Sequence, residues 1–188
     1  YIIDYEGKKL NLYWGDLHMH TNISPCSLNT EFHCTEIEEK YRFCRDVANL
    51  DFAMVTDHDT MSEYEWNRTR EIAHFNNIPG EFTVFVGLEW TNLKSKDKPN
   101  QEGDYNVLYR NEGPFLNRRN KEHDNIVKVW NKLEKGQALT IPHHPGDRID
   151  TLDWRYFNPD FEPLVEIFQT RGSYEYDSCP MNPTNYGR

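Results

Sequence analysis

Four short segments place histidines or carboxylates at the end of an apolar run, and these residue types can bind metal ions or transfer protons. The segments are Asp16–His20, Thr56–Asp59, Gly87–Trp90 and Pro142–Pro145. Side chains at the carboxyl ends of parallel strands meet at one mouth of an α/β sheet or barrel. The sequence therefore predicts a metal site that is assembled from several strands.

The first two segments each offer more than one donor. His18 and His20 are two residues apart, so on an extended strand both imidazoles face the same side, which suits two ligands of one ion. The alternative is a pair of solvent-facing loop histidines. Asp57, His58 and Asp59 follow a buried strand, where an uncompensated charge is costly. We expect His58 to be a ligand and either aspartate to orient an imidazole, although Asp59 could instead cap a helix.

The third and fourth segments supply a buried carboxylate and two adjacent imidazoles. Glu89 follows the apolar run 84–88 and is the candidate for a carboxylate that bridges two ions; the alternative is a salt bridge to a lysine or arginine. His143 and His144 are neighbours, so in an extended segment they point in opposite directions. We therefore expect one of them to be a ligand, and the other to support it or to face the substrate.

The remaining histidines and the cysteines are weaker candidates. His33, His74 and His123 lie in loop or helix contexts without converging partners and are expected at the surface. The four cysteines lack the paired spacing of a zinc knuckle. Cys44 falls on the apolar face of an expected helix and is therefore assigned to the core.

Apolar runs alternate with helical patterns along the chain, which predicts βα units in a single domain over residues 1–188. The first two helices should begin with capping boxes, Thr35 with Glu38 and Ser62 with Glu65. The first of these helices should bury Ile37, Tyr41, Cys44 and Ala48. Strands are expected at 12–20, 52–55, 83–88, 105–109, 138–141 and 164–168, and helices after Thr35, after Ser62 and from Asp124 to Gly136.

Composition restricts the class of protein. Hydrophobic residues make up 37% of the chain and aromatic residues 14%, which is typical of a folded domain. The net charge of −10 argues against an electrostatic grip on nucleic acid or on an anionic membrane. No apolar run approaches the roughly 20 residues of a membrane span. The sequence starts at Tyr1, so a removed signal peptide would leave no trace, and both a cytoplasmic and an exported location stay open.

Taken in order, the four segments resemble the motifs of the PHP (polymerase and histidinol phosphatase) family. Gly15–Thr21, Val55–Asp59, Gly87–Trp90 and Pro142–Gly146 correspond to its first to fourth motifs, and the likeness covers nearly the whole chain. The resemblance implies a distorted (β/α)7 barrel with two or three zinc, manganese or iron ions at its C-terminal mouth.

The same resemblance assigns ligands. His18, His20 and Glu89 would hold one metal, Glu89 would bridge to a second that His144 completes, and His58 would belong to a third. Cys26, eight residues after His18, occupies the position of a further ligand of the third metal, with a plain loop cysteine as the alternative.

The chain also departs from the family pattern at two points. Asp104 stands where relatives often have a histidine, and an aspartate favours harder ions. No Asp-x-His follows His144, so the closing strands of the barrel are expected to be missing and the activity of this chain alone is in question.

The function expected from the residues and the resemblance is hydrolysis of a phosphate ester in a small phosphorylated substrate by a metal-activated water. Glu89, His144, Asp57 and Arg148 are the candidates for the catalytic centre, Arg148 as a phosphate-binding side chain whose alternative is a surface salt bridge. Two other readings stay open: hydrolysis of a different bond, such as an amide, and a non-catalytic module that metal stabilises.

Overall fold

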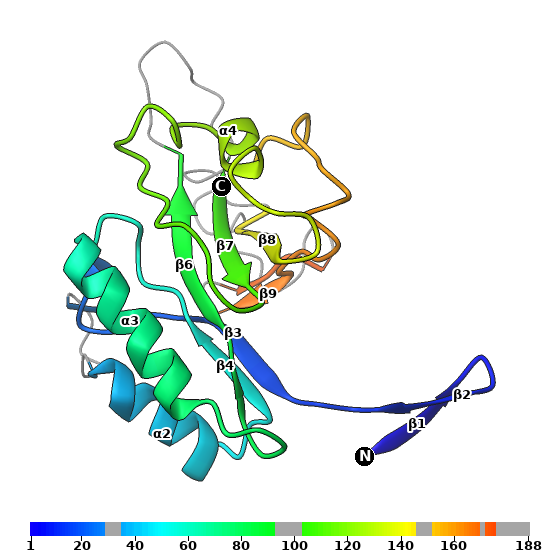
Figure 1. The fold of residues 1–188 in the computed structure, drawn as a ribbon. Coiled ribbons are helices and arrows are strands. Elements are labelled where there is room, and N and C mark those ends of the chain that lie inside the picture. The colour runs from blue at the N-terminus through cyan, green and yellow to red at the C-terminus, as the bar shows by residue number, and fades with distance from the viewer. Residues whose placement is uncertain (29–34, 93–102, 146–151, 170–171, 176–188) are drawn as a thin grey trace.

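The structure is a computed structural model that describes residues 1–28, 35–92, 103–145, 152–169 and 172–175. A bent layer of strands carries two helices, α2 and α3, side by side on one face, and a two-stranded hairpin projects from the body (Figure 1). In chain order the elements are β1 (Ile2–Tyr5), β2 (Lys8–Asn11), β3 (Gly15–Met19), α1 (Pro25–Leu28), α2 (Ile37–Asp46), β4 (Phe52–Val55), α3 (Glu63–Asn76), β5 (Thr83–Val84), β6 (Val86–Thr91), β7 (Asp104–Tyr109), α4 (Ile126–Trp130), β8 (Ala138–His143), β9 (Phe168–Gln169) and β10 (Gly172–Ser173).

Two three-stranded sheets form the centre of the molecule. The parallel sheet has the order β3-β4-β5 and the antiparallel sheet the order β6-β7-β8. Backbone hydrogen bonds join the sheets, because the Glu89 N–H donates to Asp57 and the Asp59 N–H donates to Glu89. A parallel bridge pairs His58 with Glu89. Strands β3, β4, β6 and β8 therefore run in the same direction.

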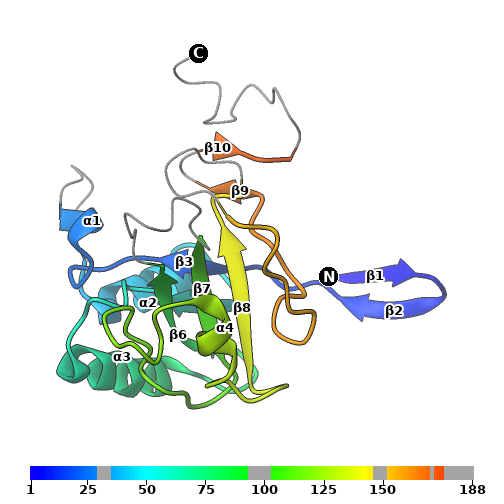
Figure 2. The same ribbon diagram turned by 90° about the horizontal axis from the view of Figure 1, so that it is seen from above.

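The expected (β/α)7 barrel is wrong. In the described residues the sheets are small and of mixed direction, and they close no barrel. Parallel neighbours need a long crossover, usually a helix, whereas β6, β7 and β8 form an antiparallel meander. The helix expected from Asp124 to Gly136 is reduced to the five residues of α4, and the strand expected at 164–168 is only β9. Figure 2 shows β9 and β10 beyond the end of β8.

Both amphipathic helices cover the strands from the same side. Strand β4 is the continuous apolar run expected at 52–55, and three of its four residues are buried. Helix α3 begins at the predicted capping box, in which Ser62 and Glu65 bond each other's backbone N–H. Helix α2 buries Ile37, Tyr41 and Cys44 as predicted, whereas Ala48 lies beyond its end and is exposed.

The capping box expected at Thr35 is wrong. Helix α2 has Glu36 at its N-cap position and no side-chain cap. The Thr35 carbonyl instead accepts the Asn22 N–H from the loop after β3. The Thr35 hydroxyl, which would have formed the cap, has no hydrogen-bond partner among the described residues.

The two faces of the β6-β7-β8 sheet differ in character. One face carries Trp90, Tyr105, Val107 and Tyr109, all almost completely buried in the core beneath α3 and α4. Directly paired residues share a face, and so do residues two apart on a strand. The opposite face therefore carries Glu89, Asn106 and Ile141 in one row and Asp104 and His143 in the next.

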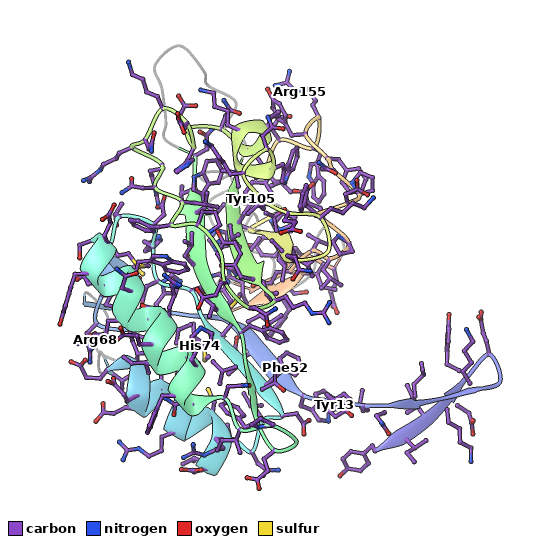
Figure 3. The ribbon with its side chains drawn as sticks, in the orientation of Figure 1. Tyr13, Phe52, Arg68, His74, Tyr105 and Arg155 are labelled. Atoms are coloured by element: carbon purple, nitrogen blue, oxygen red, sulfur yellow. The ribbon has the colours of Figure 1, made fainter. Side chains whose placement is uncertain are left out.

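The hairpin β1-β2 lies outside this core. Every residue in its two strands is exposed. The labelled Tyr13 lies where the chain leaves the body toward the hairpin (Figure 3). No helix among the described residues is long and apolar enough to cross a membrane.

Candidate metal centre

The centre of the site is the Glu89 carboxylate, which is 3% exposed and surrounded by four imidazoles. One oxygen, Oε2, lies 3.5 Å from His18 Nε2 and 3.0 Å from His20 Nε2. The other, Oε1, lies 3.4 Å from His58 Nδ1 and 3.5 Å from His143 Nε2. Each oxygen thus faces two ring nitrogens, and four separate segments of the sequence contribute to one cluster.

Strand direction explains why these side chains meet. Strands β3, β4, β6 and β8 are parallel, and the histidines lie at or just beyond the carboxyl ends of β3, β4 and β8. Glu89 lies within β6, next to His58 through the parallel bridge between the two sheets. The arrangement needs aligned strands but no closed barrel.

The charges in the cluster are strongly coupled. Burial alone would raise the pKa of Glu89, but the contacts with His143, His18 and His20 outweigh it and hold this pKa well below its usual value. Burial likewise tends to lower the pKa of His18, and Glu166 and Glu89 outweigh it to raise the pKa to about 9. For His20, burial is outweighed by Cys26 and Glu89, and the pKa rises to about 10. Without metal, protons on His18 and His20 neutralise Glu89.

Glu166 also belongs to the site, although its position in the sequence did not predict this role. Its Oε2 lies 2.8 Å from His18 Nδ1, so it accepts the proton of that nitrogen and leaves Nε2 directed at Glu89. A carboxylate that fixes the far nitrogen is the usual support of a histidine ligand. The signal was present: Glu166 interrupts the apolar run 164–168 in the same way as Glu89 follows 84–88.

Asp57 supports the site through a serine. It is fully buried and accepts hydrogen bonds from the backbone and hydroxyl of Thr21 and from the hydroxyl of Ser24. Ser24 Oγ in turn lies 3.1 Å from His20 Nδ1. Asp57 therefore orients His20 indirectly, and it fixes the loop that follows β3.

A second group of donors consists of Asp104, His143 and His144, whose ligand atoms all lie within 4.8 Å of one another. All three are buried. The expectation that the adjacent histidines point apart is wrong, because His144 has a positive φ of 55° and leaves the extended conformation. The two rings lie 4.5 Å apart, and His144 Nδ1 is 3.5 Å from Asp104.

Several buried ring nitrogens of these histidines form no hydrogen bond among the described residues. Three of them, His143 Nε2, His58 Nδ1 and His144 Nδ1, lie 3.4–3.5 Å from a carboxylate oxygen but form no hydrogen bond among the described residues, and His143 Nδ1 has no hydrogen-bond partner there either. Buried polar atoms are almost always paired, and a neutral imidazole offers a lone pair to a metal. These orphaned nitrogens fit bound cations.

A third group consists of His20, Cys26 and His58, again with ligand atoms within 4.8 Å of one another. Cys26 lies in α1, and its sulfur is 3.6 Å from His20 Nδ1. Burial would raise the pKa of Cys26, but His20 and His58 outweigh it and lower the pKa to about 6. The cysteine that the resemblance placed near the third metal is therefore beside two histidines.

Asp59 has a different role from its neighbours. It is fully buried and forms an ion pair with Arg118, which also donates its backbone N–H at 2.7 Å. Burial raises the pKa of Asp59 to about 6 in spite of this partner. The pair fixes the loop that contains Arg118 against the segment after β4, and no pattern in the sequence linked these residues.

Other predicted residues lie elsewhere. His74 is exposed on α3, where it contacts Glu112 at 2.7 Å. His123 is not at the surface: it is 9% exposed, and its carbonyl accepts the Trp90 indole N–H. His33 and Arg148 lie outside the described residues.

A cavity lies apart from the histidine cluster. Its volume is about 720 Å³, and its lining contains none of the clustered histidines. Leu108, Leu139 and Ile141 line it from the same sheet face that carries Glu89 and His143. This face is therefore polar toward the carboxyl ends of β6 and β8 and apolar farther back.

Comparison with known proteins places the chain in a family whose activity has no description. Residues 46–183 match the model of the family described as "Protein of unknown function (DUF3604)", and the chain belongs to this family. It is also similar to an uncharacterized protein of Chlamydia pneumoniae, with 23% identity over 177 residues. The alignment covers 92% of this chain and 27% of that relative, so the chain spans about a quarter of the relative's length.

Proposed function

We propose that this domain is a metal-dependent hydrolase whose ions are held around Glu89. The observation that carries this proposal is the buried carboxylate with two imidazole nitrogens facing each of its oxygens. A buried carboxylate is costly without cations, and the orphaned nitrogens beside it need partners. Divalent ions satisfy both requirements.

The donor atoms divide into two adjoining ligand sets. His18, His20 and Glu89 Oε2 would hold one ion. Asp104, His143 and His144 would hold another, with Glu89 Oε1 beside His143. Imidazole and carboxylate donors suit zinc, manganese and iron. When bound, such ions polarise the scissile group and lower the pKa of a water nucleophile to near 7.

The surrounding residues prepare these ligands. Glu166 accepts the Nδ1 proton of His18, which fixes the tautomer whose Nε2 lone pair faces Glu89. Ser24, anchored by Asp57, fixes the ring of His20. This pre-organisation keeps the ligand atoms in place without a rearrangement when an ion enters.

The bond to be hydrolysed is proposed from the resemblance to PHP phosphoesterases. It rests on the order of the four motifs and on two ligand sets around one carboxylate, which can stabilise charge on phosphoryl oxygens. The substrate class is accordingly a small phosphorylated compound, and the net charge of −10 does not favour a nucleic acid.

The test is hydrolysis of an aryl phosphate monoester and an aryl phosphate diester by the purified chain, reconstituted with Mn²⁺ or Zn²⁺. We expect turnover that a chelator abolishes and Glu89→Gln removes. Glu162→Gln is the matched control, because Glu162 is also buried and contacts a backbone N–H instead of histidines. A metal-loaded chain that hydrolyses neither ester would overturn the phosphoesterase proposal and favour the metal-stabilised module.

A further inference from the structure

The cavity of about 720 Å³ lies at the end of the strands that is remote from the clustered histidines. Its lining includes Phe52, Thr83 and Ala138, which are the first residues of β4, β5 and β8. The histidines of the metal centre lie at or beyond the carboxyl ends of their strands. The cavity is therefore a site of its own, formed between the two sheets.

The wall of the cavity consists mainly of apolar side chains that no other part of the described chain covers completely. Leu17, Phe52, Phe85 and Leu139 line it and are half-buried. Phe52 and Phe85 pack edge to face, with ring centroids 6.2 Å apart. The labelled Tyr13 and Phe52 mark the side of the body on which the cavity lies (Figure 3). Protein interiors leave few voids larger than a water molecule, and pockets for small organic ligands measure roughly 300–1,000 Å³. Volume and lining thus fit an apolar ligand.

One cationic side chain, Arg110, lines the same cavity. Its backbone N–H donates to the Gln137 carbonyl at 2.8 Å, which fixes the residue beside the opening, and it lies two residues after Leu108 of the cavity wall. Arg110 is exposed. Unlike Arg70 and Arg155, it has no carboxylate partner among the described residues. In a chain with a net charge of −10, such a guanidinium is available to an anionic group of a ligand.

Two acidic side chains on the other side of the cavity restrict where that anionic group can lie. Asp51 directly precedes β4, and its carboxylate accepts the Trp14 backbone N–H at 2.7 Å. Glu81 lies shortly before β5 and is exposed. Both repel an anion from the parallel sheet. The favourable position for a negative headgroup is therefore at Arg110, on the antiparallel sheet.

We infer that this cavity binds an amphipathic monoanion, with an aliphatic or aromatic body between the sheets and a carboxylate headgroup at Arg110. A guanidinium matches the geometry of a carboxylate with two parallel hydrogen bonds. The apolar body leaves water against Leu17, Phe52 and Leu139, so each further methylene that fits should tighten binding roughly fourfold. The inference goes beyond the proposed hydrolysis and does not depend on it, because no clustered histidine lines the cavity.

Isothermal titration with decanoate and with uncharged 1-decanol tests the headgroup. We expect the wild-type chain to bind one equivalent of decanoate. Arg110→Gln should weaken decanoate binding roughly fivefold, as expected for a solvent-accessible ion pair, and leave 1-decanol binding unchanged. Arg42→Gln is the matched control, since Arg42 is exposed on α2 and does not line the cavity, and it should match the wild type. Equal decanoate affinities of Arg110→Gln and the wild type would overturn the assignment.

Filling the cavity tests the position of the apolar body. Leu139→Trp should abolish binding of both ligands, whereas Leu10→Trp, the same enlargement on the exposed hairpin, should not affect it. Unchanged binding by Leu139→Trp would place the ligand elsewhere and refute the inference. So would self-association that Leu139→Trp removes in a chain that binds no decanoate, because the cavity would then belong to a second copy.

A metal control separates this inference from the proposed hydrolysis. Decanoate affinity should be the same in the presence of chelator and in the zinc-loaded chain. Binding that chelator abolishes would place the ligand at the metal centre and overturn a separate site. A chain that binds decanoate but hydrolyses no ester keeps the cavity site and loses only the hydrolase proposal, whereas an active chain that binds no decanoate loses only this inference.

Discussion

Replacing Glu89 by glutamine should weaken metal binding more than any other isosteric change in the chain. The substitution keeps the volume of the side chain and removes its charge from the point at which four imidazoles meet. Because each oxygen faces a different pair of histidines, the loss affects two ions together.

The size of the effect follows from electrostatics. A pair of unit charges about 4 Å apart contributes roughly 4 kcal/mol at an effective dielectric constant of about 20, and a divalent ion doubles this. Desolvation of Glu89, which is 3% exposed, offsets much of the gain. A net loss of about 2.8 kcal/mol for each ion corresponds to roughly 100-fold weaker binding.

Competition titration with a chromogenic chelator measures these affinities, and elemental analysis after dialysis counts the ions that remain. Glu162→Gln controls for the removal of a buried carboxylate, and His74→Ala controls for the loss of an exposed histidine. Both controls should match the wild type. Affinities of Glu89→Gln within threefold of the wild type would refute the bridging role.

Four further predictions concern the residues around this carboxylate and the rest of the fold. Glu166→Gln should lower metal affinity by roughly 10- to 100-fold, because it removes the carboxylate that fixes His18; an unchanged chelator titration would contradict this. Metal must displace protons from His18 and His20, whose pKa values are raised to about 9 and about 10, so zinc affinity should rise with pH up to about 10, and binding at pH 7 should release protons that an indicator dye detects. The same shifts stabilise the metal-free fold below pH 6.5, and this stabilisation should be lost as the pH rises through about 9 to 10; equal urea midpoints at pH 7 and 10.5 would speak against it. Burial raises the pKa of Glu162 to about 7 from its ordinary value of 4.5. The protonated side chain therefore stabilises the fold fully below pH 4.5, and this stabilisation is lost as the pH rises through 7. Glu162→Gln, which cannot ionise, should accordingly stabilise the fold above pH 7 by up to about 3 kcal/mol but should have no such effect at pH 4.

Two local patterns predicted local structure correctly. The apolar run 52–55 is strand β4, and the pair Ser62 and Glu65 caps α3, because both signals depend on residues close in sequence. The overall architecture was predicted wrongly, since a barrel requires crossovers and strand pairings that depend on distant segments. No clear pattern in a single sequence predicts that β7 pairs antiparallel with both β6 and β8.

The site shows the same division between local and distant information. The motifs indicated His18, His20, His58 and Glu89, which the structure places in one cluster. The relation between His143 and His144 was predicted wrongly because it depends on one backbone angle.

The supporting contacts were not found from the motifs. Glu166 is 148 residues away from His18, and Arg118 is 59 residues away from Asp59. Residues so far apart in the sequence belong to no common motif, so only the folded structure shows that they are in contact.

The ladder between β6, β7 and β8 sets the spacing of the ligands, since Glu89 lies opposite Asn106 and Asp104 lies opposite His143. A slip of one residue in β7 would turn Asp104 to the core face and bring Tyr105 to the ligand face. Length changes in the connecting loops would leave these pairings intact. Evolution can thus vary the length of the connections between these three strands, whereas an insertion or deletion inside one of the strands would break the ladder in a single step.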